Sequence, residues 1–276
     1  MFQDTVKNFK INFNALNQGN TFSSGDVMTG NISFDLTKET KISSITMTLT
    51  GKANVRWSTG GGKKRRRRPY SAKLDFFDLK SVIVQQNSAT VAVHRPWHMS
   101  KDFVTECNFV NRINTNQPEL HAPLSGSNSM TMCCLWCTSG PIEMTASIEK
   151  KGFMPGETVK IICEFINGSS RTATPKVSLQ QKQVFYTHNK NHRRMHVKKL
   201  MSSAGQLVSE RISDRRTVIE LTIPSSASLT ISNCSIIDVE YLIEVSFSVR
   251  GSPDLDVLFP IIMCDTPVDA HPPSYL

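Results

Sequence analysis

Residues 241–249 read YLIEVSFSV, and apolar side chains occupy every second position from the first to the last. Successive side chains of a β-strand point to opposite faces, so these alternate residues line one face of a sheet. Similar alternation recurs around Phe9, Ile32, Ile45 and Ile142, and no stretch of a dozen residues keeps a helical period. Short strands separated by Gly, Asn, Ser and Pro predict an all-β protein built from antiparallel sandwiches.

An internal similarity predicts two such sandwiches. The segment FSSGD at 22–26 opens a strand that continues through Phe34, and FMPGE at 153–157 opens one that continues through Phe165. An offset of about 131 residues relates the two segments, as expected for two copies of one unit. The chain length of 276 residues suits two domains of ordinary size.

The first copy is shorter than the second. The second copy contains a strand that ends at Ile223-Pro224 and a connection to residues 239–241, and the first copy has no counterpart of this block. We therefore expect the first sandwich to lack about two strands of ordinary length, as a skipped exon or a faulty gene model would produce. The predicted organisation is an incomplete N-terminal sandwich at 1–114, a linker at 115–130, a C-terminal sandwich at 131–265 and a flexible tail at 266–276.

Charge and cysteine content indicate a soluble intracellular protein. The formal net charge is +9, and six positive charges stand in one run, so the excess is local. The seven cysteines are an odd number, and the first residues do not resemble a signal peptide, which favours free thiols over a disulfide framework. No segment approaches the roughly 20 apolar residues that span a bilayer.

Several short motifs follow one another in a specific order and spacing. They are the Phe-x-x-Gly-acid segment after an opening strand, Val55-Arg56-Trp57, Arg95-Pro96-Trp97, Asn116-Gln117-Pro118-Glu119-Leu120, Ile148-Glu149-Lys150, and the run from Ile223-Pro224 through Asn233-Cys234 to Val239-Glu240-Tyr241. In these motifs the sequence resembles the α-arrestins, the arrestin domain-containing family, over nearly the whole chain.

The resemblance implies a fold and a role. The fold is two tandem arrestin-like, immunoglobulin-type β-sandwiches, the first of them shortened here. The role is a non-enzymatic adaptor without cofactors, which links membrane cargo to HECT-type ubiquitin ligases with WW domains for ubiquitination, endocytosis and trafficking. Its partners include cytoplasmic segments of receptors or transporters. It resides in the cytoplasm and is recruited to the plasma membrane and endosomes.

The end of the chain carries the candidate ligase-binding peptide, Pro272, Pro273, Ser274 and Tyr275. Prolines favour a polyproline II helix with three residues per turn, which places Pro272 and Tyr275 on one edge. That edge suits the aromatic-lined groove of a WW domain. The other interpretation of these residues is a disordered, proline-containing chain end.

A second candidate site is the basic run Lys63, Lys64, Arg65, Arg66, Arg67 and Arg68. It lies between a strand ending near Trp57 and one starting near Tyr70, so a solvated hairpin loop is its simplest interpretation. Such a run can also contact an anionic membrane leaflet, at about 1 kcal/mol per charge, or act as a nuclear-import signal. Nucleic acid ranks last, because no aromatic residue interrupts the run.

Other chemistry is not predicted. Cys133, Cys134 and Cys137 lack a second ligand pair nearby for zinc, and we expect His192 and His196 to be surface histidines. Common hydrolase, metalloprotease and phosphate-binding motifs are missing from the sequence. The alternative functions are a thioredoxin-binding regulator and a structural subunit of a sorting complex. A thioredoxin-binding relative would carry a Cys in the loop at 209–216, and this chain does not.

Overall fold

A computed structural model describes residues 5–16, 20–39, 42–60, 67–85, 102–131, 140–249 and 252–269. Strands dominate these residues, and α1 (Pro118–His121) is the single helix among them. No helix in these ranges is long and apolar enough to cross a membrane. The predicted all-β class is confirmed.

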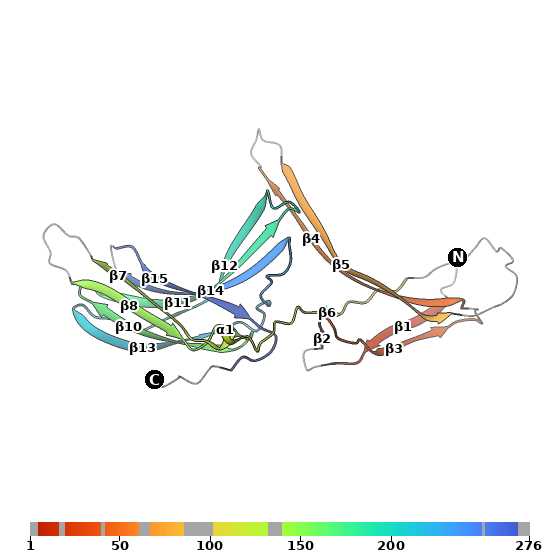
Figure 1. Ribbon diagram of the computed structural model, residues 1–276, viewed down its shortest axis with the longest axis horizontal. Helices are drawn as coiled ribbons and strands as arrows, with labels where there is room; N and C mark the ends of the chain where they lie inside the picture. The colour runs from red at the N-terminus through yellow and green to blue at the C-terminus, as the bar shows by residue number, and fades with distance from the viewer. Residues whose placement is uncertain are drawn as a thin grey trace. The chain divides into compact units, whose positions relative to one another are not determined.

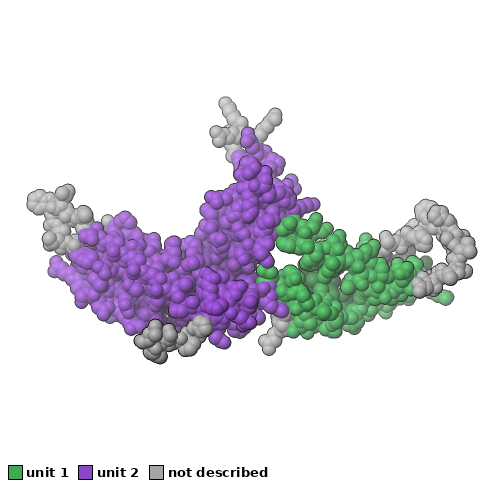
Figure 2. Space-filling view, in the orientation of Figure 1, with its two compact units in different colours: residues 1–53, 74–111 green, residues 54–73, 112–276 purple. Residues whose placement is uncertain are grey.

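The chain divides into two compact units (Figure 2). Unit 1 comprises residues 1–53 and 74–111, and unit 2 comprises residues 54–73 and 112–276. The boundary cuts through one long hairpin, formed by β4 (Ser44–Thr59) and β5 (Arg68–Gln85). The hairpin tip, residues 54–73, thus belongs with the C-terminal part of the chain, which local sequence patterns did not predict.

Unit 2 contains two sheets that together form a sandwich, and all their strand pairs are antiparallel except the parallel pair of β15 with β9 (Figure 1). The four-stranded sheet has the order β13-β10-β8-β7, and the five-stranded sheet has the order β12-β11-β14-β15-β9. The bounds of the first sheet are β13 Ile212–Thr222, β10 Thr158–Asn167, β8 Pro141–Ile148 and β7 Leu124–Thr131. Those of the second are β12 Arg193–Ala204, β11 Ala173–Tyr186, β14 Ile237–Val249, β15 Leu255–Met263 and β9 Gly152–Phe153.

The core of unit 2 follows from the alternation in its strands. Along β14 every second residue from Val239 to Val249 is buried, as the sequence predicted. These side chains join apolar side chains of β8, β10, β11, β13 and β15 in one cluster, in which the Phe165 and Phe247 rings stack with centroids 4.4 Å apart. Full burial of each such side chain contributes about 1.5 to 3 kcal/mol, so this cluster stabilises the sandwich.

Besides its part of the β4–β5 hairpin, unit 1 contains two short strand pairings. β1 (Val6–Phe13) pairs with β3 (Gly30–Leu36), and β2 (Thr21–Phe22) pairs in parallel with β6 (Asn108–Phe109). Among the described residues of unit 1, Phe22 is the single fully buried apolar side chain. Many large apolar side chains are exposed there: Leu16, Val27, Leu36, Met47, Phe76, Leu79, Val82, Ile83, Val84, Phe103, Val104 and Phe109. Such exposure is typical of a sandwich with missing strands. The loss of two strands itself stays a prediction.

Two predicted boundaries need correction. The second half of the linker placed at 115–130 is strand β7, which pairs with β8 along its whole length. Its Ser, Asn and Gly residues resembled a loop because β7 is an edge strand with one solvated face. The start of the tail placed at 266–276 packs on the C-terminal sandwich, because Val268 is only 2% exposed and lies against Leu120 and Cys264.

Candidate functional site

The structure places only part of the residues that the sequence singled out. Residues 272–275, residues 63–66 and the cysteines at 133, 134 and 137 lie outside the described ranges. Arg67 and Arg68 lie at the start of β5 and are exposed. Two described features of unit 2 are considered as candidate sites. One is the hairpin tip. The other, here called the anchor, is the group of contacts by which Lys150 and His121 hold the segment that follows β15.

Aromatic contacts fix the hairpin tip within unit 2. Trp57 of β4 is 6% exposed, and Tyr70 of β5 stacks on it with ring centroids 5.5 Å apart. The Tyr70 ring also contacts the His192 imidazole at 4.7 Å, and the Lys73 N–H donates to Nε2 of His188 at 3.3 Å. Both histidines belong to the turn between β11 and β12, so that turn holds the base of the hairpin tip.

These contacts bring two basic segments together. Arg67 and Arg68 closely precede Tyr70, and Arg193 and Arg194 directly follow His192. All four arginines are exposed, as are Lys198 and Lys199 further along β12. His192 is exposed, as predicted, and its ring also contacts Tyr70. His196 is exposed beside the Phe185 ring, with centroids 6.2 Å apart.

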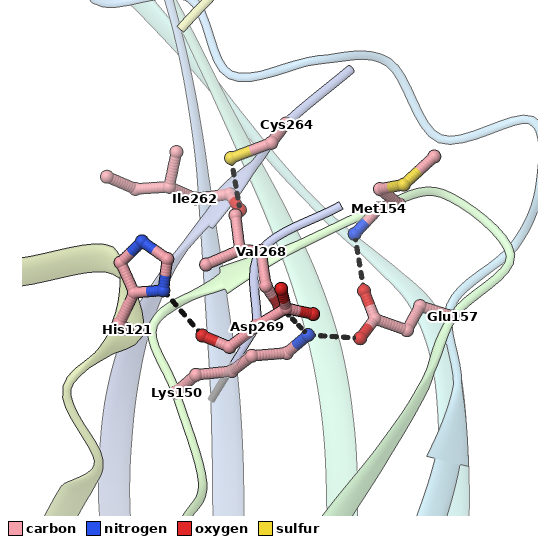
Figure 3. Close-up of polar contacts among 8 residues, drawn as sticks. All are labelled: His121, Lys150, Met154, Glu157, Ile262, Cys264, Val268 and Asp269. Carbon is pink, nitrogen blue, oxygen red and sulfur yellow. Dashed lines mark hydrogen bonds and ion pairs between the residues drawn. The ribbon is translucent and has the colours of Figure 1, made fainter. Parts of the chain in front are cut away.

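Lys150 is the centre of the second feature (Figure 3). Its side chain is 8% exposed, and its ammonium group donates to Glu157 Oε1 and to the Val268 carbonyl oxygen, both at 2.5 Å. The ammonium also lies over the Phe153 ring, 5.1 Å from its centroid. A buried charge is tolerated only when paired and hydrogen-bonded. Lys150 therefore ties the β8–β9 turn to the segment that follows β15.

Glu157 and Gly152 explain why this sequence builds the anchor. Glu157 Oε2 accepts the Met154 N–H at 2.8 Å, so the turn that opens β10 fixes the carboxylate for Lys150. A side chain at Gly152 would put its Cβ 2.9 Å from Val268 Cγ2 and 3.3 Å from Leu120 Cβ. Glycine at this position therefore allows the linker and the C-terminal segment to approach β9 closely.

His121 closes the anchor from the linker side. Its Nδ1 lies 2.5 Å from the Asp269 carbonyl oxygen, and its Nε2 lies 2.7 Å from the Thr115 carbonyl oxygen. A carbonyl oxygen only accepts hydrogen bonds, and a neutral imidazole donates one. Both contacts therefore become hydrogen bonds together only when the ring carries two protons.

A small apolar cluster supports these polar contacts. Leu120, Cys264 and Val268 are buried together, with Ile113 and Ile262 packed against them. The Cys264 N–H donates to the Phe153 carbonyl at 2.8 Å, which continues the parallel pairing of β15 with β9. Burial, reinforced by the charge of Asp265, raises the pKa of Cys264 to about 11. This thiol is protonated at neutral pH and acts as a packing group.

Sequence reasoning missed this anchor. Ile148-Glu149-Lys150 and Glu157 were noted only as parts of motifs. No contact between them and the C-terminal tail was predicted. A charged residue at 150 suggests a solvated surface, and no local pattern connects it to a carbonyl 118 positions away. A usable signal was the Phe-x-x-Gly-acid turn, whose carboxylate needs a partner if it is buried.

Comparison with known proteins identifies the family of the chain. The family model for the arrestin (or S-antigen) C-terminal domain matches residues 138–268, and the one for the N-terminal domain matches residues 9–95. The chain belongs to the α-arrestin family. The two matches follow the order of the predicted sandwiches. Lys150, Glu157 and Val268 of the anchor lie within the C-terminal match, and His121 and Asp269 lie outside it.

The relatives of this α-arrestin include two kinds of protein. Human arrestin domain-containing protein 4 is 27% identical over 182 residues, which cover 66% of this chain and 43% of the relative. Human thioredoxin-interacting protein is 20% identical over 94% of this chain and 74% of the relative. The chain thus spans less than half the length of arrestin domain-containing protein 4. The alignment with thioredoxin-interacting protein has 299 positions, more than the 276 residues of this chain, so it includes positions that this chain lacks.

Among solved structures, the sporulation control protein Spo0M from Bacillus subtilis has a TM-score of 0.34 and 16% identity, covering 46% of this chain and 49% of its own. A likeness of this degree does not bear on the fold.

Proposed function

We propose that this α-arrestin is a non-enzymatic adaptor that links membrane cargo to HECT-type ubiquitin ligases through the peptide Pro272–Tyr275. The anchor in unit 2 carries the proposal. Lys150 and His121 hold the chain up to Asp269, and the candidate ligase-binding peptide begins three residues later. The motif thus follows a fixed segment of the C-terminal sandwich closely in sequence, which suits a peptide that joins a bound ligase to a folded adaptor.

The chemistry of the peptide fits a WW-domain groove. In polyproline II geometry Pro272 and Tyr275 present one apolar edge, and Ser274 lies off that edge. The tyrosine ring provides a large contact area with a polar end. Tyr275 is therefore the side chain on which ligase binding depends most.

Cargo and membrane contacts belong to the sandwich domains in this proposal. Strand edges and loops recognise cytoplasmic segments of receptors or transporters, and the adaptor acts from the cytoplasm at the plasma membrane and endosomes. The basic run at 63–68 adds weak attraction to anionic lipid. The contact of Tyr70 with His192 brings the segment that carries Arg67 and Arg68 to the turn that precedes Arg193 and Arg194, and all four arginines are exposed, which supports this role.

The similarity to thioredoxin-interacting protein makes a thioredoxin-binding regulator the second candidate. Disulfide exchange with a partner requires an accessible thiolate. Among the described cysteines, Cys163, Cys234 and Cys264 are buried and Cys107 is half-buried, and burial raises the pKa of Cys163 to about 12. The loop at 209–216 contains no cysteine. These observations favour the adaptor over the redox regulator. The Pro272–Tyr275 peptide, which a sorting-complex subunit would not need, favours the adaptor over that subunit.

Calorimetry of the peptide comprising residues 266–276 against WW domains of HECT ligases tests the proposal. We expect binding by the natural peptide, a loss of binding in Tyr275→Ala, and retained binding in the control Ser274→Ala, whose side chain lies off the contact edge. In cells, Tyr275→Ala in the full chain should abolish ligase recovery at unchanged Tm. Equal affinity of the natural and Tyr275→Ala peptides would remove the basis of the proposal.

A further inference from the structure

Strand β12 lies at one edge of the five-stranded sheet (Figure 1). It pairs with β11 on one side, and among the described residues no strand pairs with its other side. Every residue from Arg193 to Lys199 is exposed, so both faces of this part of the strand are open to solvent. The edge of such a strand presents N–H and C=O groups that can pair with a further strand.

The side chains of this exposed part form two different rows. Successive residues of a strand point to opposite faces. Arg194, His196 and Lys198 therefore form a basic row on one face, and Met195 and Val197 form an apolar row on the other. The pairing with β11 has no register shift over these five residues, so the alternation is regular. The apolar row is open to solvent, because Met195 is 53% and Val197 is 55% exposed.

The basic row borders a hollow of about 630 Å³ in the surface of the sheet. Gln181 at this hollow is buried and donates to the Tyr241 hydroxyl at 2.6 Å, so its side chain is fixed in place. The hollow leaves room for side chains of an added strand to approach the basic row. Its lining residues are Gln181, Gln183, Phe185, His196, Val197 and Lys198.

The charge of this edge discriminates between partners. Residues 187–199 include five Lys or Arg residues and no Asp or Glu. If two copies of β12 paired antiparallel about His196, Arg194 of each copy would lie opposite Lys198 of the other. Like charges directly opposite each other are unfavourable in a sheet, so pairing between two copies is opposed. An acidic strand would instead place opposite charges at the same positions.

We propose that the free edge of β12 binds an extended acidic peptide as an added strand. Three acidic side chains at alternate positions lie opposite Arg194, His196 and Lys198, and two apolar side chains between them lie opposite Met195 and Val197. This alternation reads the same in both chain directions, so it fits a parallel or an antiparallel strand. In this binding mode main-chain hydrogen bonds give affinity and alternate side chains give specificity.

The inference rests on the proposed function, because it names the kind of cargo segment that a strand edge of the adaptor recognises. An anionic lipid surface is the other partner that the positive charge would attract. Lipid headgroups do not provide a strand's backbone groups or its alternation of acidic and apolar side chains. The peptide therefore accounts for both rows of β12, and the lipid surface accounts for the basic row alone.

Calorimetry with the full chain and a capped synthetic peptide tests the inference. The central five residues of the peptide alternate between Glu and Val and begin and end with Glu. We expect Arg194→Glu/Lys198→Glu to weaken binding at least about tenfold. Both side chains are exposed, so this variant should keep its Tm. A peptide with Lys in place of Glu should bind the variant more tightly than it binds the natural chain.

Lys160→Glu/Lys176→Glu is the matched control. These two lysines are exposed on β10 and β11, and their replacement changes the net charge by the same amount. This variant should bind the acidic peptide like the natural chain. An equal loss of binding in both double variants would show that the peptide responds to net charge alone, which would overturn the inference.

Two further kinds of peptide test whether a strand is added. A peptide with its Glu and Val residues in separate blocks keeps the charge and loses the alternation, so it should bind at least about fivefold more weakly. Only alternate residues of a strand direct their N–H groups to one neighbour. Of two peptides that carry backbone N-methyl groups on Glu or on Val, one should therefore lose binding and the other should keep it. Equal binding by the block peptide, or by both N-methyl peptides, would contradict strand addition.

The remaining outcomes separate this inference from the proposed ligase role. If no acidic peptide binds, and vesicles of phosphatidylcholine and phosphatidylserine bind the natural chain but not Arg194→Glu/Lys198→Glu, β12 is a lipid contact and the inference is wrong. Tyr275→Ala should leave binding of the acidic peptide unchanged, because that residue belongs to the candidate ligase-binding peptide. Failure of the acidic peptide beside normal WW-domain binding overturns the inference alone. The reverse result overturns the ligase role and supports the acidic-peptide site.

Discussion

The two copies of the Phe-x-x-Gly-acid turn are built alike and lie in regions that are packed differently. In both copies the acidic side chain accepts the backbone N–H three residues earlier at 2.8 Å, from Ser23 to Asp26 and from Met154 to Glu157. In both, the aromatic residue is buried, at 2% for Phe22 and 0% for Phe153. In the strand that follows, every second residue is buried in β10 of unit 2, and Ile32 and Phe34 of β3 in unit 1 are only half-buried.

This contrast separates local from collective effects. The turn needs only five neighbouring residues, so both copies form it. Burial of the following strand needs a second sheet to cover it, and in unit 2 that cover comes from β11, β14 and β15. A two-stranded ribbon alone is marginally stable in water. The number of covering strands, and not the quality of the turn, therefore sets the stability of each copy.

The largest expected difference is in amide hydrogen exchange. Amides of β10 and β14 should exchange only through global opening of unit 2, at about 5 kcal/mol or more, which slows exchange at least about 10³-fold. Amides of β1, β3 and residues 74–85 of β5 should exchange through local opening at much smaller cost. Mass spectrometry of peptides from both units makes the comparison. Equal protection of the two units would show that unit 1 has a complete core.

The second-largest difference should appear in the loss of stability when equivalent phenylalanines of the two copies are replaced with alanine. Phe34 and Phe165 occupy equivalent positions in the two copies, and Phe165 is 0% exposed and stacked on Phe247. Phe165→Ala leaves a cavity and should cost about 3 to 5 kcal/mol. Phe34→Ala removes a half-buried ring and should cost about 1 kcal/mol. Urea unfolding measures the first, and exchange of β1 amides measures the second. Similar costs for both would contradict the packing difference.

Cysteine reactivity should show a smaller difference, at least about tenfold at pH 8. Cys107 of unit 1 is half-buried, and Cys163 and Cys264 of unit 2 are buried, with pKa values raised to about 12 and about 11. Labelling with a thiol reagent, read by mass spectrometry of separate peptides, should therefore modify Cys107 first. Rapid modification of Cys264 in the folded chain would contradict its burial.

The same pKa shifts predict the sign of a pH effect. Folding raises the pKa of Cys163 and Cys264 above the ordinary 9.0, so the folded state favours the protonated thiols. Their contribution to the stability of unit 2 is complete below about pH 9 and is lost as the pH rises toward 11 and 12. Replacing Cys163 with Ala should reduce the loss of stability in this range.

Much of the fold could be predicted from the sequence, because it depends on local patterns. Alternation at 241–249 identified β14, and the repeated turn identified two copies of one unit. The anchor could not be predicted in this way. Lys150 and Val268 are 118 positions apart, and His121 and Asp269 are 148 apart. Such contacts follow from how β9 and β15 pair, and that pairing has two residues on each strand and leaves little periodic signal.

The two turn glycines should respond equally, although the units around them differ. Gly25 has φ +88° and Gly156 has φ +90°, a region that side chains with a Cβ enter at a cost of about 1 to 2 kcal/mol. An added Cβ meets nothing within 4 Å at Gly25 and only Ser225 Cβ at 4.0 Å at Gly156, so backbone strain is the whole effect at both positions. The amides that report on each turn also match, because Val110 donates to Phe22 and Cys264 donates to Phe153, both at 2.8 Å. Gly25→Ala should speed exchange of the Val110 amide, and Gly156→Ala that of the Cys264 amide, by about tenfold each. A much larger factor for Gly156→Ala would mean that the turn in unit 2 depends on its covering strands. The turn could then no longer be treated as a local structure that forms independently of the packing around it.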